Sequence, residues 1–381
     1  MSGVSGAGRG GGNAGGKGGS ANQGGTAGTP VAGSGGRSGG SGGSAAGGGG
    51  RTGGGSGAGG SGAAVGGGTS GGDGGGSGGS SASTGGGGTS GGGTSGGGTS
   101  GGGSGGSAGG SSNCVATGFH VKDGVLYDVK CNEFVMRGVN YPYTWFATRN
   151  TQQDLGAIAA TGANAVRIVL SSGGRWTRTT GSTLTSILGW AKAAKLVSIV
   201  EVHDTTGYSE QSGSVALSNA TSYWTSSDIA AALLGQEPYV IVNVGNEPNG
   251  NNTSNSWVSS HVTAVEALRN SGYEHTLMVD APNWGQDWEN SMRDGGGVPI
   301  WQADASKNIV FSVHMYDVYG SSSTISSYFN GFLSAYDAPL VVGEFAADHG
   351  DSGNVDEDTI MSLAENLSIG YLGWSWAGNS G

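Results

Sequence analysis

The 381-residue chain contains 86 glycines and carries a formal net charge of −11 at neutral pH. Residues 1–112 hold 58 of these glycines, no Trp, Tyr or Phe and only five charged side chains, so this segment cannot bury enough apolar surface to fold. Residues 113–381 contain all 10 Trp and carry a net charge of −14, which disfavours nucleic acid and anionic membranes as partners. An uncharged or cationic ligand suits this part better, and tryptophans are a common stacking surface for sugars.

The glycine-rich segment, residues 1–112, is predicted to be a disordered tether. It repeats Gly-Gly-Gly-Thr-Ser near residues 86–103, and a Gly/Ser coil of this length spans about 55–65 Å on average. Met1–Val4 begins no recognisable signal peptide, and no run of about 18 apolar residues predicts a membrane-spanning helix. Since long tethers and paired cysteines are typical of exported proteins, we expect a secreted or surface-tethered protein whose natural start lies upstream of Met1.

Residues 118–136 are predicted to form a series of β-hairpins. Short apolar segments lie on either side of Asp123-Gly124, a dipeptide that favours a two-residue hairpin turn. Cys114 precedes the first strand and Cys131 follows the second, so antiparallel pairing would bring the two cysteines together. A disulfide between them would contribute about 3 kcal/mol through chain entropy, and two free thiols are the alternative. Neither cysteine has the histidine neighbours in sequence that a zinc site or a catalytic thiol needs.

From residue 135 onwards, short apolar segments alternate with segments of helical periodicity. The apolar segments predict eight strands, at Val135–Asn140, Ala165–Leu170, Val197–His203, Tyr239–Asn246, Thr276–Asp280, Ile309–His314, Leu340–Phe345 and Tyr371–Trp376. The segments between them predict helices at Leu155–Ala160, Leu184–Ala194, Val215–Leu234, Val258–Arg269, Ile325–Ala335 and Glu357–Asn366. Such alternation indicates a parallel sheet covered on both faces, and eight units in about 250 residues predict an α/β fold of the (β/α)8 TIM-barrel type.

A doubly wound open sheet is the alternative arrangement of these elements. It would place a glycine-rich phosphate loop after the first strand, and Arg137–Pro142 does not provide one. We therefore expect two parts, the tether at 1–112 and a barrel domain at 113–381. Only Ala377–Gly381 follow the last predicted strand, so the closing helix of the barrel is missing and we expect a C-terminal truncation.

Polar and aromatic residues follow the apolar strands where these end. In a TIM barrel the strand ends form the mouth that carries the chemistry. The residues are Asn140, Arg167, His203, Asp204, Asn246, Glu247, Asp280, His314, Tyr316, Glu344 and Trp374. Glu247 ends the fourth strand and Glu344 the seventh, so we expect the two to face each other across the mouth. Paired carboxyls across a cleft suit cleavage of a glycosidic bond, in which one donates a proton and the other attacks.

Three other interpretations compete for the residues of this mouth. In the first interpretation, each glutamate forms an ion pair with an arginine or lysine and has only a structural role. The second is a metal site, and its candidate ligands are Glu201, His203, Asp204 and His314. Against a metal site, Asp204 would point to the opposite face of the strand from Glu201 and His203, and no His-x-His pattern is present. The third, a serine nucleophile, would need a Gly-x-Ser-x-Gly elbow after a strand, which the sequence lacks. We therefore expect no metal and no cofactor.

At Asn246-Glu247-Pro248 and Gly343-Glu344-Phe345 the sequence resembles glycoside hydrolase family 5, in particular its bacterial endo-β-1,4-mannanases. The likeness covers nearly all of residues 117–379. The supporting stretches are Phe134–Asn140, Gly162–Ile168, Glu201–Tyr208, Met278–Gln286, Phe311–Tyr316 and Gly373–Trp376. The resemblance implies endo-acting hydrolysis of β-1,4-mannan by a retaining mechanism, with Glu247 as the acid/base and Glu344 as the nucleophile.

The resemblance also implies roles for the residues around the catalytic pair. Tyr316 and Arg167 would orient Glu344 and keep it ionised, and Asn246 would bind the 2-hydroxyl of the reacting sugar. Trp374 would form the floor beneath that sugar. The other cleft residues that the resemblance implies are His203, His314, Trp145, Trp176 and Trp284.

The chain departs from the family pattern at three places. Tyr141–Tyr143 replaces a stretch that resembles His-Ala-His, Asn249 stands where an aromatic residue is common, and Ala346-Ala347 replaces a glycine-bearing segment. These positions bear on the choice between mannan and glucan, so an endo-β-1,4-glucanase is the neighbouring alternative. A non-catalytic polysaccharide-binding protein is the alternative of another class. We expect a monomer whose partner is β-mannan polysaccharide or oligosaccharide.

Overall fold

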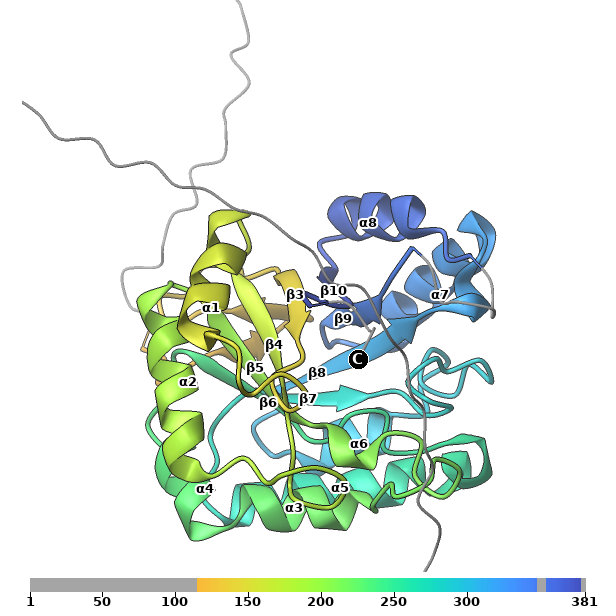
Figure 1. Ribbon diagram of the computed structural model, residues 1–381. Helices are drawn as coiled ribbons and strands as arrows, with labels where there is room; N and C mark the ends of the chain where they lie inside the picture. The colour runs from red at the N-terminus through yellow and green to blue at the C-terminus, as the bar shows by residue number, and fades with distance from the viewer. Residues whose placement is uncertain (1–114, 348–353, 378–381) are drawn as a thin grey trace, which may run out of the picture. The chain divides into compact units, whose positions relative to one another are not determined.

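The computed structural model describes residues 115–347 and 354–377 (Figure 1). The predicted tether and Cys114 lie outside these residues, as do the last four residues of the chain. The boundary between tether and barrel and the pairing of Cys114 with Cys131 therefore stay predictions. Within the described residues, no helix has the length and apolar character needed to cross a membrane.

A closed barrel of parallel strands forms the centre of the described chain (Figure 1). Its strands are β3 (Arg137–Tyr141), β4 (Ala165–Leu170), β5 (Val197–Val202), β6 (Val240–Asn243), β7 (Leu277–Asp280), β8 (Ile309–Met315), β9 (Leu340–Phe345) and β10 (Gly370–Gly373). Neighbours pair in chain order, and β10 pairs with β3 to close the ring. The eight predicted strands and the TIM-barrel fold are confirmed, although β5, β6 and β10 end earlier than predicted.

Helices surround the barrel and connect its strands. In the described segments these are α1 (Thr151–Ala160), α2 (Gly181–Ala193), α3 (Leu217–Trp224), α4 (Ser227–Leu233), α5 (Trp257–Asn270), α6 (Val298–Ala303), α7 (Ser322–Ala335) and α8 (Glu357–Asn366). Three short 3₁₀ helices add to them, η1 (His203–Thr205), η2 (Asn251–Ser256) and η3 (Asp317–Tyr319). The sequence did not predict α6, which is too short for a periodic pattern.

The prediction of one helix over Val215–Leu234 is wrong, because the helix is interrupted between α3 and α4. The Thr225 hydroxyl donates to the Thr221 carbonyl at 3.0 Å, and the Ser226 hydroxyl donates to the Tyr223 carbonyl at 2.6 Å. Ser226 is extended, with φ −66° and ψ 144°. Hydroxyl side chains that bond to nearby backbone compete with helix continuation, which explains the break.

A two-stranded hairpin precedes the barrel, as the Asp-Gly signal predicted. Its strands β1 (His120–Lys122) and β2 (Val125–Tyr127) are antiparallel. Asp123 and Gly124 have φ values of 51° and 77°, the left-handed conformation that such a turn requires. The predicted series does not continue beyond this hairpin, because residues 134–136 form no strand and an isolated bridge pairs Tyr127 with Glu133.

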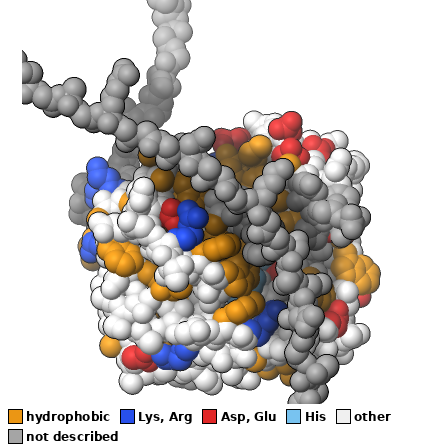
Figure 2. Space-filling model, in the orientation of Figure 1, with side chains coloured by type: hydrophobic (Ala, Val, Ile, Leu, Met, Phe, Trp, Pro, Cys, Tyr) orange, Lys and Arg blue, Asp and Glu red, His pale blue; other side chains and the backbone are white. Residues whose placement is uncertain are grey.

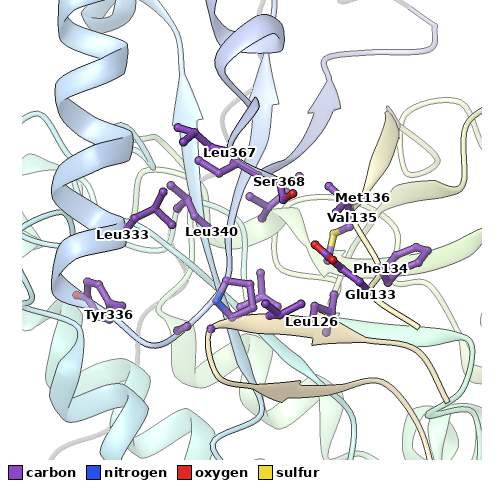
Figure 3. Close-up of a pocket in the computed structure, with 18 of the residues that line it drawn as sticks. Leu126, Glu133, Phe134, Val135, Met136, Leu333, Tyr336, Leu340, Leu367 and Ser368 are labelled. Atoms are coloured by element: carbon purple, nitrogen blue, oxygen red, sulfur yellow. The ribbon is translucent and has the colours of Figure 1, made fainter. Parts of the chain in front are cut away.

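The hairpin packs against the end of the barrel where the strands begin, which we call the base. Phe119 and Leu126 belong to one buried cluster with inward-facing side chains of the strands. Those side chains are Met136, Ala165, Ile199, Ile241, Met278, Val310, Val341 and Leu372. A cavity of about 330 Å³ remains between the hairpin and the segment that joins α7 to β9, beside Leu126, Tyr336 and Leu340 (Figure 3).

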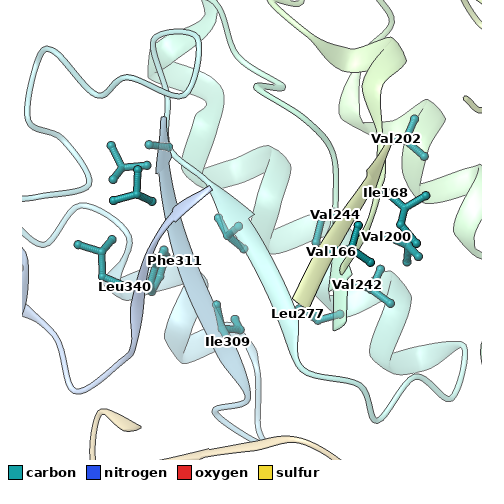
Figure 4. Close-up of a cluster of buried hydrophobic side chains, with 14 of the residues drawn as sticks. Val166, Ile168, Val200, Val202, Val242, Val244, Leu277, Ile309, Phe311 and Leu340 are labelled. Atoms are coloured by element: carbon teal, nitrogen blue, oxygen red, sulfur yellow. The ribbon is translucent and has the colours of Figure 1, made fainter. Parts of the chain in front are cut away.

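A second apolar layer lies between the strands and the helices (Figure 4). It contains the alternate positions of each strand, such as Val166 and Ile168 of β4 and Val200 and Val202 of β5. Because successive side chains of a strand point to opposite faces, the residues between these positions face the barrel axis. That alternation directs Arg167 and Glu201 into the interior, one layer above the apolar base.

Candidate active site

Arg167 lies at the centre of the barrel mouth with no solvent exposure. It donates to five residues: Asn140 Oδ1 at 3.0 Å, Asn243 Oδ1 at 2.9 and 2.7 Å, Asn246 Oδ1 at 2.7 Å, Asp280 Oδ2 at 3.2 Å and Glu344 Oε1 at 2.7 Å. A guanidinium with this many partners has a fixed orientation, because its donors are held in a planar fork. Arg167 therefore fixes the position of the side chains around it.

Glu344 reaches this network through a β-bulge. Strict alternation along β9 would turn it towards the helices, because Val342 already faces them. The register between β8 and β9 shifts after Val313, and Gly343 is passed over, so that Glu344 pairs with His314. Only glycine fits at the bulge, since a β-carbon there would overlap a serine hydroxyl of β8. The bulge brings Glu344 to the inner face.

The Glu344 carboxylate is held by two strong donors and is 3% exposed. Arg167 Nη1 donates to Oε1 at 2.7 Å, and the Tyr316 hydroxyl donates to Oε2 at 2.8 Å. Charge-assisted hydrogen bonds of this kind are short and orient a carboxylate. The site thus presents Glu344 in a fixed position with both of its oxygens bound.

Glu247 follows β6 and lies opposite Glu344 with 8% exposure. Its φ of 40° is unusual for a residue with a side chain, and its carbonyl accepts from the Gly207 amide at 2.9 Å. Burial raises the pKa of its carboxyl, the neighbouring His314 lowers it, and the nearby Glu344 raises it again. The net effect is a raised pKa, which favours the protonated acid.

The two glutamates are close enough to act on one bond. One oxygen of each and a ring nitrogen of His314 all lie within 4.8 Å of one another. A retaining glycosidase has its two carboxyl groups about 5–5.5 Å apart, whereas an inverting enzyme needs about 6.5–9.5 Å. The spacing therefore has the geometry of a retaining pair.

His314 lies between three carboxyl groups and is fully buried. Its Nδ1 is 2.7 Å from Glu247 Oε1 and 3.6 Å from Glu344 Oε2, and its Nε2 is 3.3 Å from Asp280 Oδ2. Burial alone would lower its pKa, but Glu344 and Asp280 outweigh burial and raise the pKa to about 10. A pKa raised in this direction favours the doubly protonated ring at neutral pH.

Aromatic side chains form one wall of the mouth. His203 stacks on Trp374 with ring centres 5.5 Å apart and planes 19° apart. Trp145, from the segment after β3, meets His203 and Trp374 edge-on at 5.0 and 5.9 Å, and Trp176 at 5.5 Å. Glu201 holds the Nδ1 atom of His203 at 2.9 Å. The structure thus brings the predicted Trp145, His203 and Trp374 together.

Trp284 stands on a different segment, between β7 and α6. Its indole nitrogen donates to Glu210 Oε2 at 2.9 Å. Its ring lies against Gly207, where a β-carbon would overlap the indole. Its backbone amide donates to the Asn249 carbonyl at 3.0 Å, a bond that does not depend on the side chain at position 249.

Two more predicted positions have structural contacts. The amide of Asn246 accepts from Arg167 and donates to the Thr206 hydroxyl at 2.9 Å, which fixes its orientation. Tyr141, another departure, faces away from the axis and donates to Thr151 and Asp154 of α1. It therefore packs under α1 and does not line the mouth.

The interior also contains Asn243, which sequence reasoning missed, beside Asp280, which it placed at the mouth without a specific role. Asn243 and Asp280 have no solvent exposure and bond to each other at 3.0 Å. Each stands two residues after an inward apolar residue, so alternation along the strand was the signal that could have found Asn243. The candidate metal ligand Asp204 instead accepts from Ser171 and from the amides of the segment after β4.

Sequence and structure comparisons agree on one family. The profile of Cellulase (glycosyl hydrolase family 5) matches residues 127–380. A mannan endo-1,4-beta-mannosidase of Cellvibrio japonicus is 51% identical over 266 residues, 70% of this chain and 60% of its own length. A mannan endo-1,4-beta-mannosidase of Streptomyces lividans is 47% identical and covers 71% of this chain and 69% of its own length.

A solved structure shares both the fold and much of the sequence. It is the mannohexaose complex of the Thermomonospora fusca beta-mannanase, 46% identical with a TM-score of 0.65, covering 70% of this chain and 86% of the other. This chain spans only 60% of the length of the Cellvibrio enzyme. With a family profile that matches well over half of the residues and a barrel that carries two facing glutamates, the chain belongs to glycosyl hydrolase family 5.

Proposed function

We propose that this protein is an endo-acting β-1,4-mannanase that cleaves with retention of configuration. The observation that carries the proposal is the pair of buried glutamates, Glu247 and Glu344, which have one carboxyl oxygen each within 4.8 Å of the other and lie in different surroundings. Two carboxyls whose environments differ can divide the acid and nucleophile roles between them. The 51% identity to a mannan endo-1,4-beta-mannosidase supports mannan as the substrate class.

The first step forms a glycosyl-enzyme ester on Glu344. Its carboxylate oxygen bonds to the anomeric carbon while the bond from that carbon to the glycosidic oxygen breaks. Glu247 gives its proton to the departing oxygen. The raised pKa of Glu247 suits this step, because the carboxyl must still hold a proton when the bond breaks.

The second step releases the sugar with water. Glu247, now a carboxylate, takes a proton from a water molecule whose oxygen bonds to the anomeric carbon, and the ester bond to Glu344 breaks. Both glutamates then return to their starting protonation states. When the ester breaks, Glu344 becomes a negatively charged carboxylate again. Arg167 and Tyr316 stabilise this charge through the two hydrogen bonds that they donate to it.

The mouth offers an aromatic surface for an uncharged polymer. The rings of Trp145, Trp176 and Trp374 form one wall of the mouth, and Trp284 belongs to a separate loop between β7 and α6. In Figure 2, hydrophobic side chains gather in a band near the centre of this face, and much of the remaining described surface is neither charged nor hydrophobic. Sugar rings stack on such surfaces without needing charge partners, so subsites on both sides of the glutamates would permit endo cleavage.

The test compares two polymers that differ at C2. Reducing ends released from a β-1,4-mannan and from a soluble cellulose derivative are measured side by side with the full chain and with Glu247→Gln. Release from mannan alone, lost in the variant, is the expected result. Preference for cellulose would instead establish the glucanase, and binding of both polymers without release would establish a polysaccharide-binding protein.

We further propose where the enzyme acts and how its tether is attached. An endo-acting enzyme meets a polymer too large to enter a cell, so we place it outside, as a monomer at the end of the tether formed by residues 1–112. A disulfide between Cys114 and Cys131 would fasten that tether to the barrel. Alkylation of the unreduced protein is expected to leave its mass unchanged, whereas alkylation after reduction adds two groups; labelling without reduction would contradict the disulfide.

A further inference from the structure

Asp280, the last residue of β7, lies behind both catalytic glutamates with no solvent exposure. Its Oδ2 is 3.2 Å from Arg167 Nη2 and 3.3 Å from His314 Nε2, and it accepts from the Glu247 amide at 3.2 Å. Its Oδ1 accepts from Asn243 Nδ2 at 3.0 Å. A single carboxylate therefore contacts Arg167, the His314 ring and the backbone of Glu247.

Arg167 and His314 in turn hold the two glutamates. Arg167 donates to Glu344 at 2.7 Å, and His314 Nδ1 lies 2.7 Å from Glu247 Oε1. No hydrogen bond or ion pair joins the Asp280 carboxylate to either glutamate carboxyl, so its influence on them passes through Arg167 and His314. This arrangement makes Asp280 the common support of both halves of the catalytic pair.

The two ring nitrogens of His314 face carboxyl oxygens on opposite sides. A neutral ring has one N–H, so if that proton faced Asp280, Nδ1 would be an acceptor aimed at Glu247. Such an acceptor would bind the proton that Glu247 must give to the glycosidic oxygen. A doubly protonated ring presents an N–H to Glu247 on one side and its positive charge to Asp280 on the other, and it leaves that proton free for transfer.

We propose that Asp280 is a positioning residue that keeps the His314 ring doubly protonated and Arg167 in place, so that Glu247 presents its proton to the substrate. The inference rests on the proposed function, because it assigns Glu247 as the acid. The low pKa of Asp280 supports it: burial would raise that pKa, but His314 and Arg167 outweigh burial and lower it, so the counter-ion is always charged. The other charged or titratable groups that face His314 and Arg167 are Glu201, His203, Glu247, Tyr316 and Glu344.

The first test needs no substrate and uses the unaltered protein. Nitrogen-15 NMR of labelled histidine reports whether one or both ring nitrogens carry a proton, and His314→Gln identifies the signal. We expect both nitrogens of His314 to be protonated at pH 7 and to stay so to about pH 9. The lowered pKa values of about 4 for His261 and His275 keep those rings singly protonated at this pH, so they do not mask it. A singly protonated His314 at pH 7 would overturn the proposal, whatever any variant does.

The second test is Asp280→Asn, which removes the charge and keeps the shape. We expect His314 to lose its second proton by pH 7 and kcat to fall about 100-fold with KM changed less than about threefold. With the cation beside Glu247 gone, the alkaline limb of the pH–rate profile is expected to move up by about 1 unit or more. A folded variant with an unmoved limb and a doubly protonated His314 would reduce Asp280 to a structural role and refute the proposal.

Asp304→Asn is the matched control. Asp304 is also a fully buried aspartate paired with an arginine, Arg269, at 2.7 Å, but it lies at the base, before β8 begins. It should lower stability without moving the pH–rate profile or the His314 signals. Because the NMR result is independent of turnover, failure of the wild type on mannan would count against the proposed function alone.

Discussion

The base and the mouth of the barrel are built from the same strands, two residues apart. At the base the inward positions are apolar: Ala165, Ile199, Ile241, Met278 and Val310. The next inward positions along those strands are Arg167, Glu201, Asn243, Asp280 and Ser312, all buried and polar. A step of two residues, which keeps the same face, thus separates a layer that stabilises the fold from a layer that positions reacting groups.

The two ends also differ in how their side chains are held. Base residues gain stability from burial of apolar area, which has little directional preference. Mouth residues such as Arg167 are held by charge-assisted hydrogen bonds whose geometry is exact to a few tenths of an ångström. Changes at the base should therefore alter stability, and changes at the mouth should alter rate and pH dependence.

Loss of the nucleophile should have the largest effect. Glu344→Ala removes the atom that bonds to the anomeric carbon, so kcat on mannan is expected to fall by about 10⁴-fold or more. Oligosaccharide binding, measured by calorimetry, should survive because the aromatic wall is unchanged. Hydrolysis at the wild-type rate would exclude Glu344 as the nucleophile.

Crowding the bulge should have the next largest effect. Gly343→Ala places a β-carbon on the Ser312 hydroxyl and 3.2 Å from His314 Nε2, so the Ser312 and His314 side chains must shift. We expect a fall in kcat of about 100-fold and a loss of about 1–3 kcal/mol in the free energy of unfolding. Gly156→Ala in α1 meets nothing within 4 Å and is the control, with full activity and unchanged or slightly higher stability. Equal behaviour of the two variants would contradict the role of the bulge.

A truncation at the base should alter stability alone. Leu126 of β2 is 4% exposed, where the hairpin packs against the base. Leu126→Ala is expected to cost about 2–4 kcal/mol in the free energy of unfolding. Measured well below the lowered melting temperature, kcat and the pH–rate profile should match the wild type. A shifted pH profile in this variant would show that base and mouth are not separable.

The last prediction concerns stability at alkaline pH. His314 has a folded pKa of about 10, above the value of about 6.5 expected in an unfolded chain, so the native state binds a proton that the unfolded state releases. Its contribution is full below about pH 6.5 and is lost as the pH rises through about 10. Denaturant unfolding at several pH values should show this decline in the wild type and in Leu126→Ala, but not in His314→Gln. An equal decline in His314→Gln would assign the effect to another group.

Sequence reasoning reached the barrel because its signals are local. The Asp123-Gly124 turn and the apolar strands depend on near neighbours, and both are confirmed. The helix predicted over Val215–Leu234 failed because the hydroxyls of Thr225 and Ser226 compete with the backbone, a local effect that periodicity does not register.

The site was predictable only in part, for reasons of geometry. The strand ends indicated Glu247 and Glu344, but strict alternation would have turned Glu344 outward, and only the register shift at Gly343 brings it inward. The importance of Asp280 depends on three partners from β4, the segment after β6, and β8, which no spacing along the chain reveals.

The configuration of the first product tests the central claim most directly. Mannohexaose is hydrolysed in an NMR tube, and the anomeric proton of the new reducing end is observed before the anomers equilibrate. Because the carboxyl oxygens of Glu247 and Glu344 lie within 4.8 Å, the β-anomer is expected first. The α-anomer as the first product would mean inversion and would contradict a covalent intermediate on Glu344.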